Sequence, residues 1–485
     1  MQACALVLAA GFSSRMQPLF KPLLPLPVQP LVPQPVFKPL QEAATMQGKA
    51  LPCAGAALPE AGARALDILC ELYTFCSVPV LIVCGHKGDA VAAVAQRWGL
   101  PCVNNPQPEQ GMFSSVRVGM AAVAQRMPQC THCFVHPVDI PLVRPMTILA
   151  LLAAAKGAEQ SGQAESSPWP VAEQTTTTIS PALGQPVGST ASVLGLSTSK
   201  PQPVLARQPI QECAASEPQP VLRQAAGEQA VFIPSYAGQE GHPPLLPMTL
   251  LPFVLAGQGA GGLRALLNLH PQVRVPVADS LILRDMDTAA DYAALQALAP
   301  RRHLLDAAEA DALLAVQHLP ERGRAHCCAV GAVAAAFAAL LNKARVQQEQ
   351  EPLLDVALAR VGGLLHDVCK GQHQHEQAAG QLFRAVGQAR LAWLVESHRD
   401  ISPAPHSPLT ERELVYLADK YVQGSRPVSI QQRFQQKLDV YSHDAQACAA
   451  IQQRLENALA MEASLAAALG RAPEGIARAT LPQPT

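Results

Sequence analysis

The sequence predicts two domains of different fold class: an α/β domain with a mainly parallel sheet over residues 1–300, and an all-α domain over 301–470. In the first part, short apolar runs alternate with helical patterns, which predicts parallel strands joined by helical crossovers. After Pro300, apolar residues recur at helical spacing as far as Leu469. The length of 485 residues is enough for two or three separate hydrophobic cores.

Composition and charge limit the kinds of binding partner and the cellular compartment that we expect for the protein. The formal net charge is −1 and no basic block occurs, which disfavours nucleic acid as an electrostatic partner. The thirteen cysteines are scattered and are expected to be reduced, buried thiols rather than a disulfide framework. The apolar N-terminus lacks a basic leader, and no segment reaches the roughly 20 apolar residues that span a bilayer. We therefore expect a cytoplasmic protein that does not cross a membrane.

A phosphate-binding loop is predicted directly after the first strand. Residues 3–10 form a continuous apolar run that ends at Gly11, as in a buried parallel strand. The segment from Gly11 to Met16 carries two serines and Arg15, and Lys21 follows. Backbone N–H groups, one guanidinium and one ammonium can together hold a triphosphate and neutralise its leaving group.

The string Leu8-Ala-Ala-Gly-Phe-Ser-Ser-Arg-Met, followed by Lys-Pro-Leu-Leu-Pro-Leu, resembles the opening signature of the MobA-like NTP transferases. Among these enzymes it is most similar to the molybdenum-cofactor cytidylyltransferase branch. The family usually has glycine after Arg-Met, whereas this chain has Gln17 and Pro18. The resemblance implies a Rossmann-like fold and Mg²⁺-dependent nucleotidyl transfer to molybdopterin, releasing pyrophosphate. Ala10, where guanylyl-transferring relatives tend to carry glycine, favours CTP over GTP.

The next segments continue the alternation of helix and strand. We expect a helix from Ala65, a strand over 78–84 that ends before Gly85, a helix through Val94 and a short strand at 102–103. Ligands of such sheets bind at the carboxyl ends of the strands. The stretch from Asn105 to Gly111, Ser114 and Ser115 precedes a helix, which one of the serines is expected to cap. In the resembled family the corresponding stretch recognises the nucleotide, although a capped helix start without a ligand is an equal alternative on local sequence.

Two aspartates are candidate magnesium ligands in this domain. Asp139 follows an apolar strand, where one carboxylate with phosphate oxygens and water suits Mg²⁺, and the resemblance assigns it that role. Asp287 lies in a closing Asp-Met-Asp string and is the second candidate, with N-capping of a final helix as the alternative. His242 lies in a Gly-His-Pro stretch that is also similar to the family. The expected nucleotide-binding residues are Leu8, Ala9, Ala10, Gly11, Ser13, Ser14, Arg15, Lys21, Gly85, Asn105, Gly111, Ser114, Ser115 and His242.

Two stretches are expected to be flexible insertions and one a loose tail. Residues 25–60 are rich in proline and glutamine, and no period organises them. Residues 155–229 contain a threonine run and repeated Gln-Pro pairs with few aromatic residues, which cannot bury enough surface to offset ordering entropy. The tail over 471–485 is expected to be loose.

The second domain is organised around His366 and Asp367 at the end of an apolar helical run. Adjacent side chains on a helix point about 100° apart, so they can share an ion only when it lies close to the helix. His326, His375, His398 and Asp419 lie in or beside further helical patterns. Taken singly, each histidine is more often a surface or core residue. A set of nitrogen and oxygen ligands suits Fe, Mn, Ni or Zn better than Mg²⁺.

The order of these residues, over 318 to about 434, resembles the HD-domain metal-dependent phosphohydrolases. The resemblance implies that His326, His366, Asp367 and Asp419 hold one metal, that His375 and His398 hold another, and that Asp367 bridges the two. A hydroxide supplied by the metals would attack phosphorus while Lys370 neutralises the substrate. The implied substrate is a nucleotide or another cofactor phosphoester.

The chain is thus expected to be a bifunctional enzyme whose substrates are an NTP, a molybdopterin-type acceptor and a phosphoester. Arg15, Lys21, Asp139, Asp367 and Lys370 are the candidate catalytic residues. A molybdoenzyme or its maturation factor is the expected protein partner. A sugar-phosphate nucleotidyltransferase is the alternative for the first domain. A nucleotide sensor in which one domain is degenerate is the alternative for the whole chain.

Overall fold

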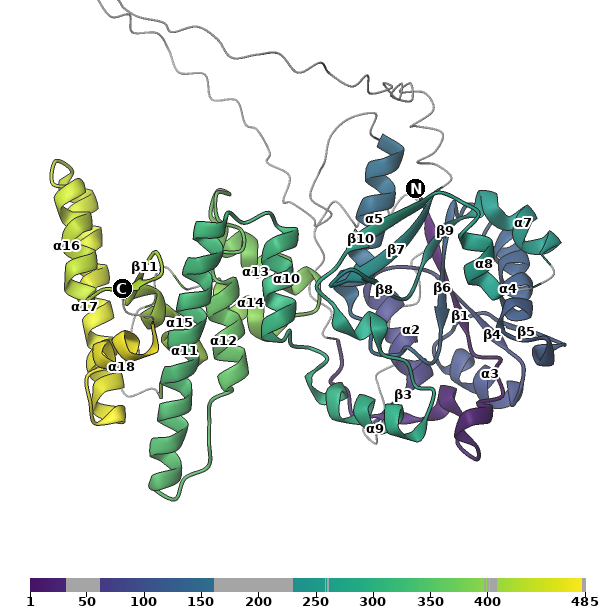
Figure 1. Cartoon of the computed structure of the whole chain (residues 1–485), viewed down its shortest axis with the longest axis horizontal. Helices are drawn as coiled ribbons and strands as arrows, with labels where there is room; N and C mark the ends of the chain where they lie inside the picture. Colours follow the sequence, from purple (N-terminus) through teal and green to yellow (C-terminus); the bar gives the residue numbers. More distant parts are fainter. Residues whose placement is uncertain are drawn as a thin grey trace, which may run out of the picture.

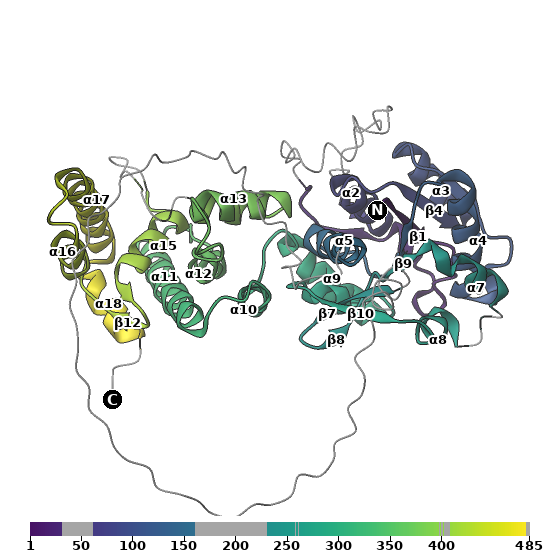
Figure 2. The same cartoon turned by 90° about the horizontal axis from the view of Figure 1, so that it is seen from above.

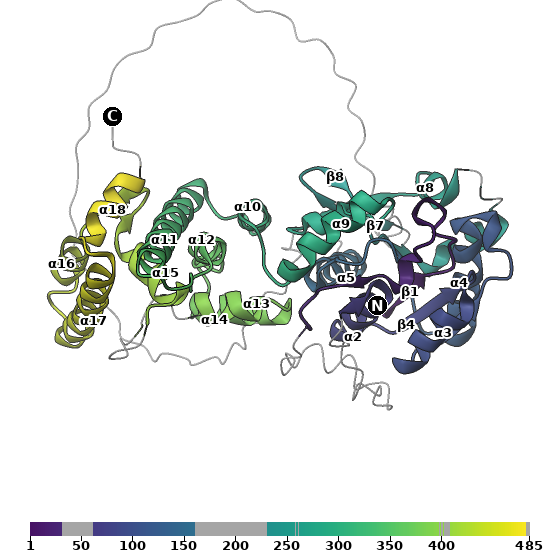
Figure 3. The same cartoon turned by 90° about the horizontal axis from the view of Figure 1, so that it is seen from below.

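The computed structural model describes residues 1–31, 62–160, 230–257, 259, 261–396, 398, 401 and 408–481. Figure 1 shows two lobes side by side, an α/β lobe that starts at the N-terminus and a helical lobe that ends at the C-terminus. The predicted order of fold classes is therefore confirmed. Turned views place α10 (Ala307–Val316) and α13 (His375–Ala385) next to the α/β lobe (Figures 2 and 3).

A mixed, mainly parallel sheet forms the centre of the first domain, in the strand order β10-β7-β9-β6-β1-β4-β5. β1 runs parallel to β4 and β6, β4 to β5, and β10 to β7, while β9 is antiparallel to both of its neighbours. β8 is antiparallel to the last two residues of β7, Ser235 and Tyr236. The strands are β1 (Ala3–Leu8), β4 (Val80–Cys84), β5 (Cys102–Asn104), β6 (His132–Pro137), β7 (Val231–Tyr236), β8 (Gln239–Glu240), β9 (Leu245–Pro247) and β10 (Gln272–Pro276).

Helices cover both faces of this sheet because alternate residues of the buried strands point to opposite sides. Ala5 and Val7 of β1 pack against α2, α3 and α5, whereas Cys4 and Leu6 pack against α4, α7 and α8. The helices are α2 (Ala65–Phe75), α3 (Gly88–Arg97), α4 (Met112–Arg126), α5 (Pro145–Gln160), α7 (Leu251–Ala256), α8 (Gly262–Leu267) and α9 (Ala289–Leu298). The shorter elements are η1 (Ser14–Met16), η2 (Lys21–Leu23), η3 (Pro108–Gln110), η4 (Met248–Leu250), η5 (Ser280–Leu283), η6 (Ala299–Arg301), and the pair β2 (Pro25–Leu26) and β3 (Ala63–Arg64).

The second domain is helical apart from one small β-hairpin. Its long helix α11 crosses α12, and α13, α14 and α15 complete the part that carries the predicted ligands. Its C-terminal helices α16, α17 and α18 lie at the end remote from the first domain (Figure 2). The elements are α11 (Glu321–Gln347), α12 (Val356–Leu365), α14 (Ala389–Val395), α15 (Glu411–Lys420), β11 (Val422–Gln423), β12 (Arg426–Pro427), α16 (Ile430–Val440), α17 (Ala445–Leu469) and α18 (Pro473–Thr480).

Glycines let α11 and α12 approach each other closely. A Cβ atom on Gly363 would lie 2.6 Å from the Cα of Gly331, and one on Gly331 would lie 2.8 Å from the carbonyl oxygen of Arg360. No larger residue fits at this crossing without moving a backbone. The close packing brings His326 near the start of α11 next to His366 at the end of α12, with their ring centroids 5.3 Å apart.

A buried network of charged groups joins the two domains. The Arg144 guanidinium, just before α5, contacts Asp279 of the first domain at 2.8 Å and Glu309 of α10 at 2.6 Å. Arg302 donates to the carbonyl oxygens of Leu142 and Val143. Apolar residues continue the contact, since Met146, Leu149 and Ala278 pack into the core of the helical domain. The junction is therefore a packed interface.

Three expectations about order and cysteine chemistry need correction. The predicted insertions begin too early: β2 and residues up to 31 are described, α5 runs to residue 160, and the rest of both insertions lies outside the described residues. The tail is not loose as far as residue 481, because α18 buries Ile476 and Ala477 in the helical core. The expectation that the cysteines are buried fails for Cys328, which is an exposed free thiol, although it holds for Cys130 and Cys133.

Candidate functional sites

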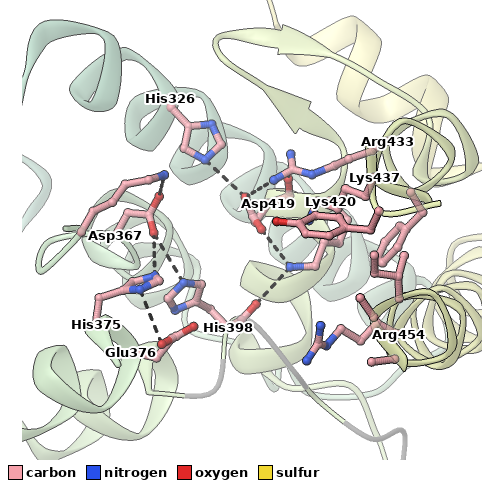
Figure 4. A pocket seen from close by; sticks show the side chains of 16 residues that line it. His326, Asp367, His375, Glu376, His398, Asp419, Lys420, Arg433, Lys437 and Arg454 are labelled. Carbon is pink, nitrogen blue, oxygen red and sulfur yellow. Dashed lines mark hydrogen bonds and ion pairs between the residues drawn. The ribbon is translucent and has the colours of Figure 1, made fainter. Parts of the chain in front are cut away.

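The six predicted ligands of the helical domain converge from five helical segments on one point, and Figure 4 shows all of them except His366. His326 belongs to α11, His366 follows α12, His375 starts α13, and Asp419 lies in the last turn of α15. His398 follows α14 and is buried. These residues are far apart along the chain but are neighbours in space, as the predicted ligand set requires.

Backbone carbonyls fix the orientation of three of the imidazoles. The Nδ1 atoms of His326, His366 and His398 lie 2.9, 2.7 and 2.7 Å from the carbonyl oxygens of Gly424, Gly363 and Val395. A carbonyl only accepts, so each Nδ1 carries the proton and each Nε2 keeps its lone pair. All three Nε2 atoms face the carboxylates at the centre.

The two oxygens of Asp367 face different groups of histidines. Oδ2 lies 3.5 Å from Nε2 of His366, and Oδ1 lies 3.3 and 3.6 Å from Nε2 of His375 and His398. Asp419 faces the other side of His366, with Oδ1 3.2 Å from His326 Nε2 and 3.8 Å from His366 Nε2. This is the arrangement of a bridging carboxylate between two ligand groups.

Burial and charge keep these groups in the protonation states that ligands need. Burial lowers the pKa of His366 to about 4, so this imidazole is neutral near pH 7. Burial opposes the charge on Asp367, but the neighbouring imidazoles and the Lys370 ammonium outweigh it and hold the pKa far below its usual range. For Asp419, burial is likewise outweighed by Lys420 and Arg433, and the pKa is well below normal.

The donor set fits divalent metal ions. Three groups of ligand atoms each lie within 4.8 Å of one another: His326, His366 and Asp419; His366, Asp367 and His398; His375, Glu376 and His398. Nε2 of His366 is buried and has no hydrogen-bond partner, although a buried polar atom normally has one. A metal ion at this position would satisfy that atom. Imidazoles mixed with carboxylates suit Fe, Mn, Ni or Zn.

Cations surround this centre and line a cavity of about 650 Å³. Lys370 contacts Asp367 at 2.5 Å, Lys420 contacts Asp419 at 2.8 Å, and Arg433 contacts Asp419 at 3.0 Å. Lys370 was predicted from the sequence. Lys420, Arg433 and Glu376 were not, although Lys420 and Glu376 each follow a predicted ligand directly and adjacency could have indicated them.

In the first domain, the predicted lysine and both predicted aspartates meet at the carboxyl edge of the sheet. The Lys21 ammonium lies 2.6 Å from Asp287 Oδ1 and 3.4 Å from Asp139 Oδ2. Arg15 of η1 reaches Asp287 Oδ2 at 2.7 Å. Strands β1 and β6 are parallel neighbours, which places the loop after β1 beside Asp139. N-capping by Asp287 is excluded, because Thr288 caps α9.

The loop after β1 is supported from two sides. Ser13 adopts a left-handed conformation, with a φ of 52°, and its hydroxyl accepts a hydrogen bond from the Lys21 backbone N–H at 3.0 Å. A Cβ atom on Gly85 would lie 2.9 Å from that of Ala10, so the loop can approach β4 closely. Leu8, Ala9 and Ala10 are buried, whereas Gly11, Ser14 and Arg15 are exposed.

The predicted serine cap is wrong. α4 begins after Gly111, and no side chain caps it. Ser114 and Ser115 instead lie inside the helix, buried, where both hydroxyls accept hydrogen bonds from the Asn105 amide at 2.8 and 2.9 Å. These residues hold the strand-to-helix loop in shape. Of the four predicted binding residues in this stretch, Gly111 is exposed and Asn105, Ser114 and Ser115 are buried.

His242 and the two aspartates complete this edge. Burial lowers the pKa of His242, and the charge of Asp139 partly offsets this shift. The two side chains therefore interact electrostatically. The Asp139 and Asp287 side chains are 29% and 35% exposed. Two accessible carboxylates that already share one cation, Lys21, fit Mg²⁺ with phosphate oxygens and water completing its octahedron.

Models of known families match both domains. The MobA-like NTP transferase domain matches residues 55–211, and the HD domain matches residues 324–423.

The chain joins a MobA-like NTP transferase domain to an HD domain.

Solved structures give distant likenesses only. The Rv0371c protein of Mycobacterium tuberculosis is 16% identical, covering 61% of this chain and 98% of its own, with a TM-score of 0.32. Another structure of that protein, in complex with manganese, is 15% identical over 61% of this chain and 98% of its own, with a TM-score of 0.31. A nucleotidyl transferase of Methanothermobacter is 15% identical over 61% and 96%, with a TM-score of 0.31. No curated protein matches the chain.

The matched ranges leave parts of both sites outside. Arg15 and Lys21 precede the start of the transferase match at residue 55. Arg433 and all of α16 and α17 follow the end of the HD match at residue 423. The six expected metal-ligand positions of the HD domain lie inside its match.

One described helix, α11, is long and apolar enough to cross a membrane by length and composition, which corrects the expectation that no segment is. However, 56% of its most apolar window is buried inside the protein. The helix carries His326 and packs against α12 and α15. These contacts are those of a central core helix of the HD domain.

Proposed function

We propose that the HD domain is a metal-dependent phosphohydrolase acting on a nucleotide or another phosphoester. The observation that carries the proposal is the position of Asp367, whose two oxygens face two separate groups of histidines. Divalent ions held there would act as Lewis acids and supply an activated water. The expected ligands are His326, His366, Asp367 and Asp419 for one ion, and His375 and His398 for the other.

The residues of the chain itself have separate tasks in this reaction. The three carbonyl-bound imidazoles present fixed lone pairs, so the ligand set needs little reorganisation to bind metal. Lys370 lies on the cavity wall next to Asp367, where its ammonium can neutralise charge that develops on the phosphoryl oxygens. Arg433 and Lys420 hold Asp419 ionised.

The test combines elemental analysis of the purified protein with a hydrolysis screen of nucleotides. We expect bound Fe, Mn, Ni or Zn at about two ions per chain, and phosphate release that a chelator stops and one of these metals restores. Hydrolysis that survives complete metal removal would contradict the proposal. So would stoichiometric metal combined with no hydrolysis of any phosphoester.

We further propose that the first domain transfers a nucleotidyl group from CTP to a molybdopterin-type acceptor. The contact of Lys21 with both Asp139 and Asp287 favours this function. A Mg²⁺-triphosphate would bring a cation for the two carboxylates and an anion for Lys21 and Arg15. The acceptor phosphate attacks the α-phosphorus, the bond to the β-phosphate oxygen breaks, and pyrophosphate leaves. A molybdoenzyme or its maturation factor is the proposed recipient of the product.

Pyrophosphate release separates the rival functions. With molybdenum-loaded cofactor and Mg²⁺, we expect release from CTP and at least tenfold less from GTP. Turnover of GTP alone would overturn the nucleotide assignment, and turnover of a sugar phosphate would overturn the acceptor. Calorimetric binding of CTP without release under any of these conditions would instead support a nucleotide sensor.

A further inference from the structure

Two helices outside the matched HD region form one wall of the metal-site cavity. The match ends at residue 423, whereas α16, α17 and the turn between them contribute eight of the residues that line the cavity. These residues are Arg433, Phe434, Lys437, Tyr441, Ala447, Ala450, Ile451 and Arg454. We call α16 and α17 the C-terminal hairpin.

The hairpin adds cations on the side of the cavity that faces the ligands. Figure 4 shows Lys437 and Arg454 across the cavity from Asp367 and His375. Lys370, Lys420 and Arg433 lie beside the metal-ligating carboxylates, which they contact. The lining therefore has cations at two separate places, one beside the metal-ligating carboxylates and one at Lys437 and Arg454.

Size and charge both indicate a ligand larger than a single phosphate. A cavity of about 650 Å³ is in the usual range for a drug-sized or nucleotide-sized ligand. The lining residues include five lysines and arginines and three carboxylates, and divalent ions would add further positive charge. A polyanion complements such a lining better than one monoester group does.

The hairpin also provides apolar surface next to its cations. Ile451 and Phe434 are buried, and the Lys437 ammonium lies 5.5 Å from the Phe434 ring centre. Tyr441 is 48% exposed and lines this cavity and a second one of about 740 Å³ beside it. An organic group attached to the phosphates thus has room and apolar contacts on either side of Tyr441.

We propose that the C-terminal hairpin is the specificity element of the HD site and binds a second phosphate group of the substrate through Lys437 and Arg454. The HD centre then prefers substrates with two or more linked phosphates over monoesters. This inference rests on the phosphohydrolase function proposed above. In the reaction, water adds across a P–O bond: its oxygen binds phosphorus, the bond electrons go to the leaving oxygen, and a proton follows. Water is the one co-reactant.

The test compares the wild type with the Lys437→Gln, Arg454→Gln double variant. The substrates are p-nitrophenyl phosphate and the mono-, di- and triphosphates of one nucleoside, assayed with the metal that the protein retains. For di- and triphosphates we expect kcat/KM to fall about tenfold to a hundredfold, mostly through KM, which is the usual size of a lost charge-assisted contact. The fall for monoesters should be several times smaller. Arg471→Gln, which removes an exposed charge just after α17, is the matched control.

Binding keeps this test separate from the proposed hydrolysis. Calorimetry of the metal-loaded protein should show that the double variant loses affinity for tripolyphosphate more than for orthophosphate. That result without any turnover would contradict the phosphohydrolase function and retain the second phosphate position. Equal losses for mono- and polyphosphates, or no losses, would overturn the inference even if the wild type hydrolyses phosphoesters. Metal content equal to the wild type shows that the centre is intact in the variant.

Discussion

In the HD domain the ligand side chains come from packed helices and their second nitrogens are bound to backbone carbonyls, whereas in the transferase domain the charged groups stand on loops at the edge of a sheet. His366 is 1% exposed, and the Arg15 side chain is 72% exposed. The first arrangement is fixed before a ligand arrives. The second is made of ion pairs that a charged ligand can rearrange, because exposed pairs are weak.

The two sites therefore hold their ligand-binding atoms in position in different ways. A metal centre needs donors at set distances, and a carbonyl-bound imidazole provides them at little entropic cost. In the proposed transferase, phosphate oxygens would compete with Asp139 and Asp287 for the Lys21 ammonium.

Removal of the bridging carboxylate should abolish one activity and spare the other. Asp367→Ala deletes the group that faces His366, His375 and His398, so we expect metal content to fall below half of the wild-type value and phosphoester hydrolysis to fall at least a thousandfold. Pyrophosphate release should remain within twofold. Elemental analysis and both assays check this, with Asp311→Ala as control. Unchanged metal content would refute the assigned ligand set.

Removal of the shared ammonium should produce the reverse pattern. Lys21→Met should lower the rate of pyrophosphate release about a hundredfold to a thousandfold, the usual cost of losing a group that stabilises transition-state charge. HD hydrolysis and metal content should not change. The matched control is Lys156→Met on α5. If Lys21→Met were as active as the wild type, the site at the sheet edge would not be the transferase site.

Loss of a residue that only supports a ligand should have a smaller effect. Arg433 contacts Asp419 Oδ1 and donates to the Asp419 carbonyl oxygen, so Arg433→Met frees that side chain. We expect the dissociation constant of the bound metal to rise about tenfold to a hundredfold. Competition with a metal indicator measures it, and Arg426→Met serves as control. An unaltered metal affinity would show that Asp419 does not need the contact with Arg433 to bind the metal.

A buried histidine outside both sites should make the transferase domain sensitive to acid. His136 accepts a hydrogen bond from Tyr73 and donates to the carbonyl oxygen of Ile140, and burial lowers its pKa to about 3. Between the unfolded pKa near 6.5 and the folded pKa, the unfolded chain binds more protons, so stability falls as pH falls.

From pH 7 to pH 5, the wild type should lose roughly 2 kcal/mol that a His136→Gln variant does not lose. Denaturant unfolding followed by fluorescence measures the difference, and His443→Gln, an exposed histidine, is the control. Parallel slopes for wild type and His136→Gln would exclude His136 as its source.

Much of the fold and the ligand set could be predicted because local patterns carry them. The apolar run over 3–10 and the helical run before His366 each have one favourable structure, and the ordered His and Asp positions resemble a known set. The bundle then brings Asp419 Oδ1 within 3.2 Å of His326 Nε2 and 3.8 Å of His366 Nε2, as a shared metal ion requires.

The rest depends on contacts that local sequence does not encode. Arg433 is 14 residues from Asp419, and a hairpin must turn back before the two meet. The Lys21 contact with Asp287 spans 266 residues. Ser114 looked like a helix cap because its type favours one, but Asn105 offered a buried partner and the helix starts earlier. α18 was missed because its apolar face is short and gains stability from the bundle.

The buried ion pairs between the two domains make the structure of each domain depend on the other. Asp139 precedes Arg144 by five residues and Asp287 follows Asp279 by eight, so both acidic segments of the transferase site are tied to the partner domain through Glu309. A chain cut at residue 300 would remove Glu309 from the Arg144 guanidinium and would expose Met146 and Leu149 to solvent. Breaking a buried pair in this way typically costs about 3–5 kcal/mol. Replacing either domain by a homologous domain would therefore require compensating substitutions in the residues of this interface.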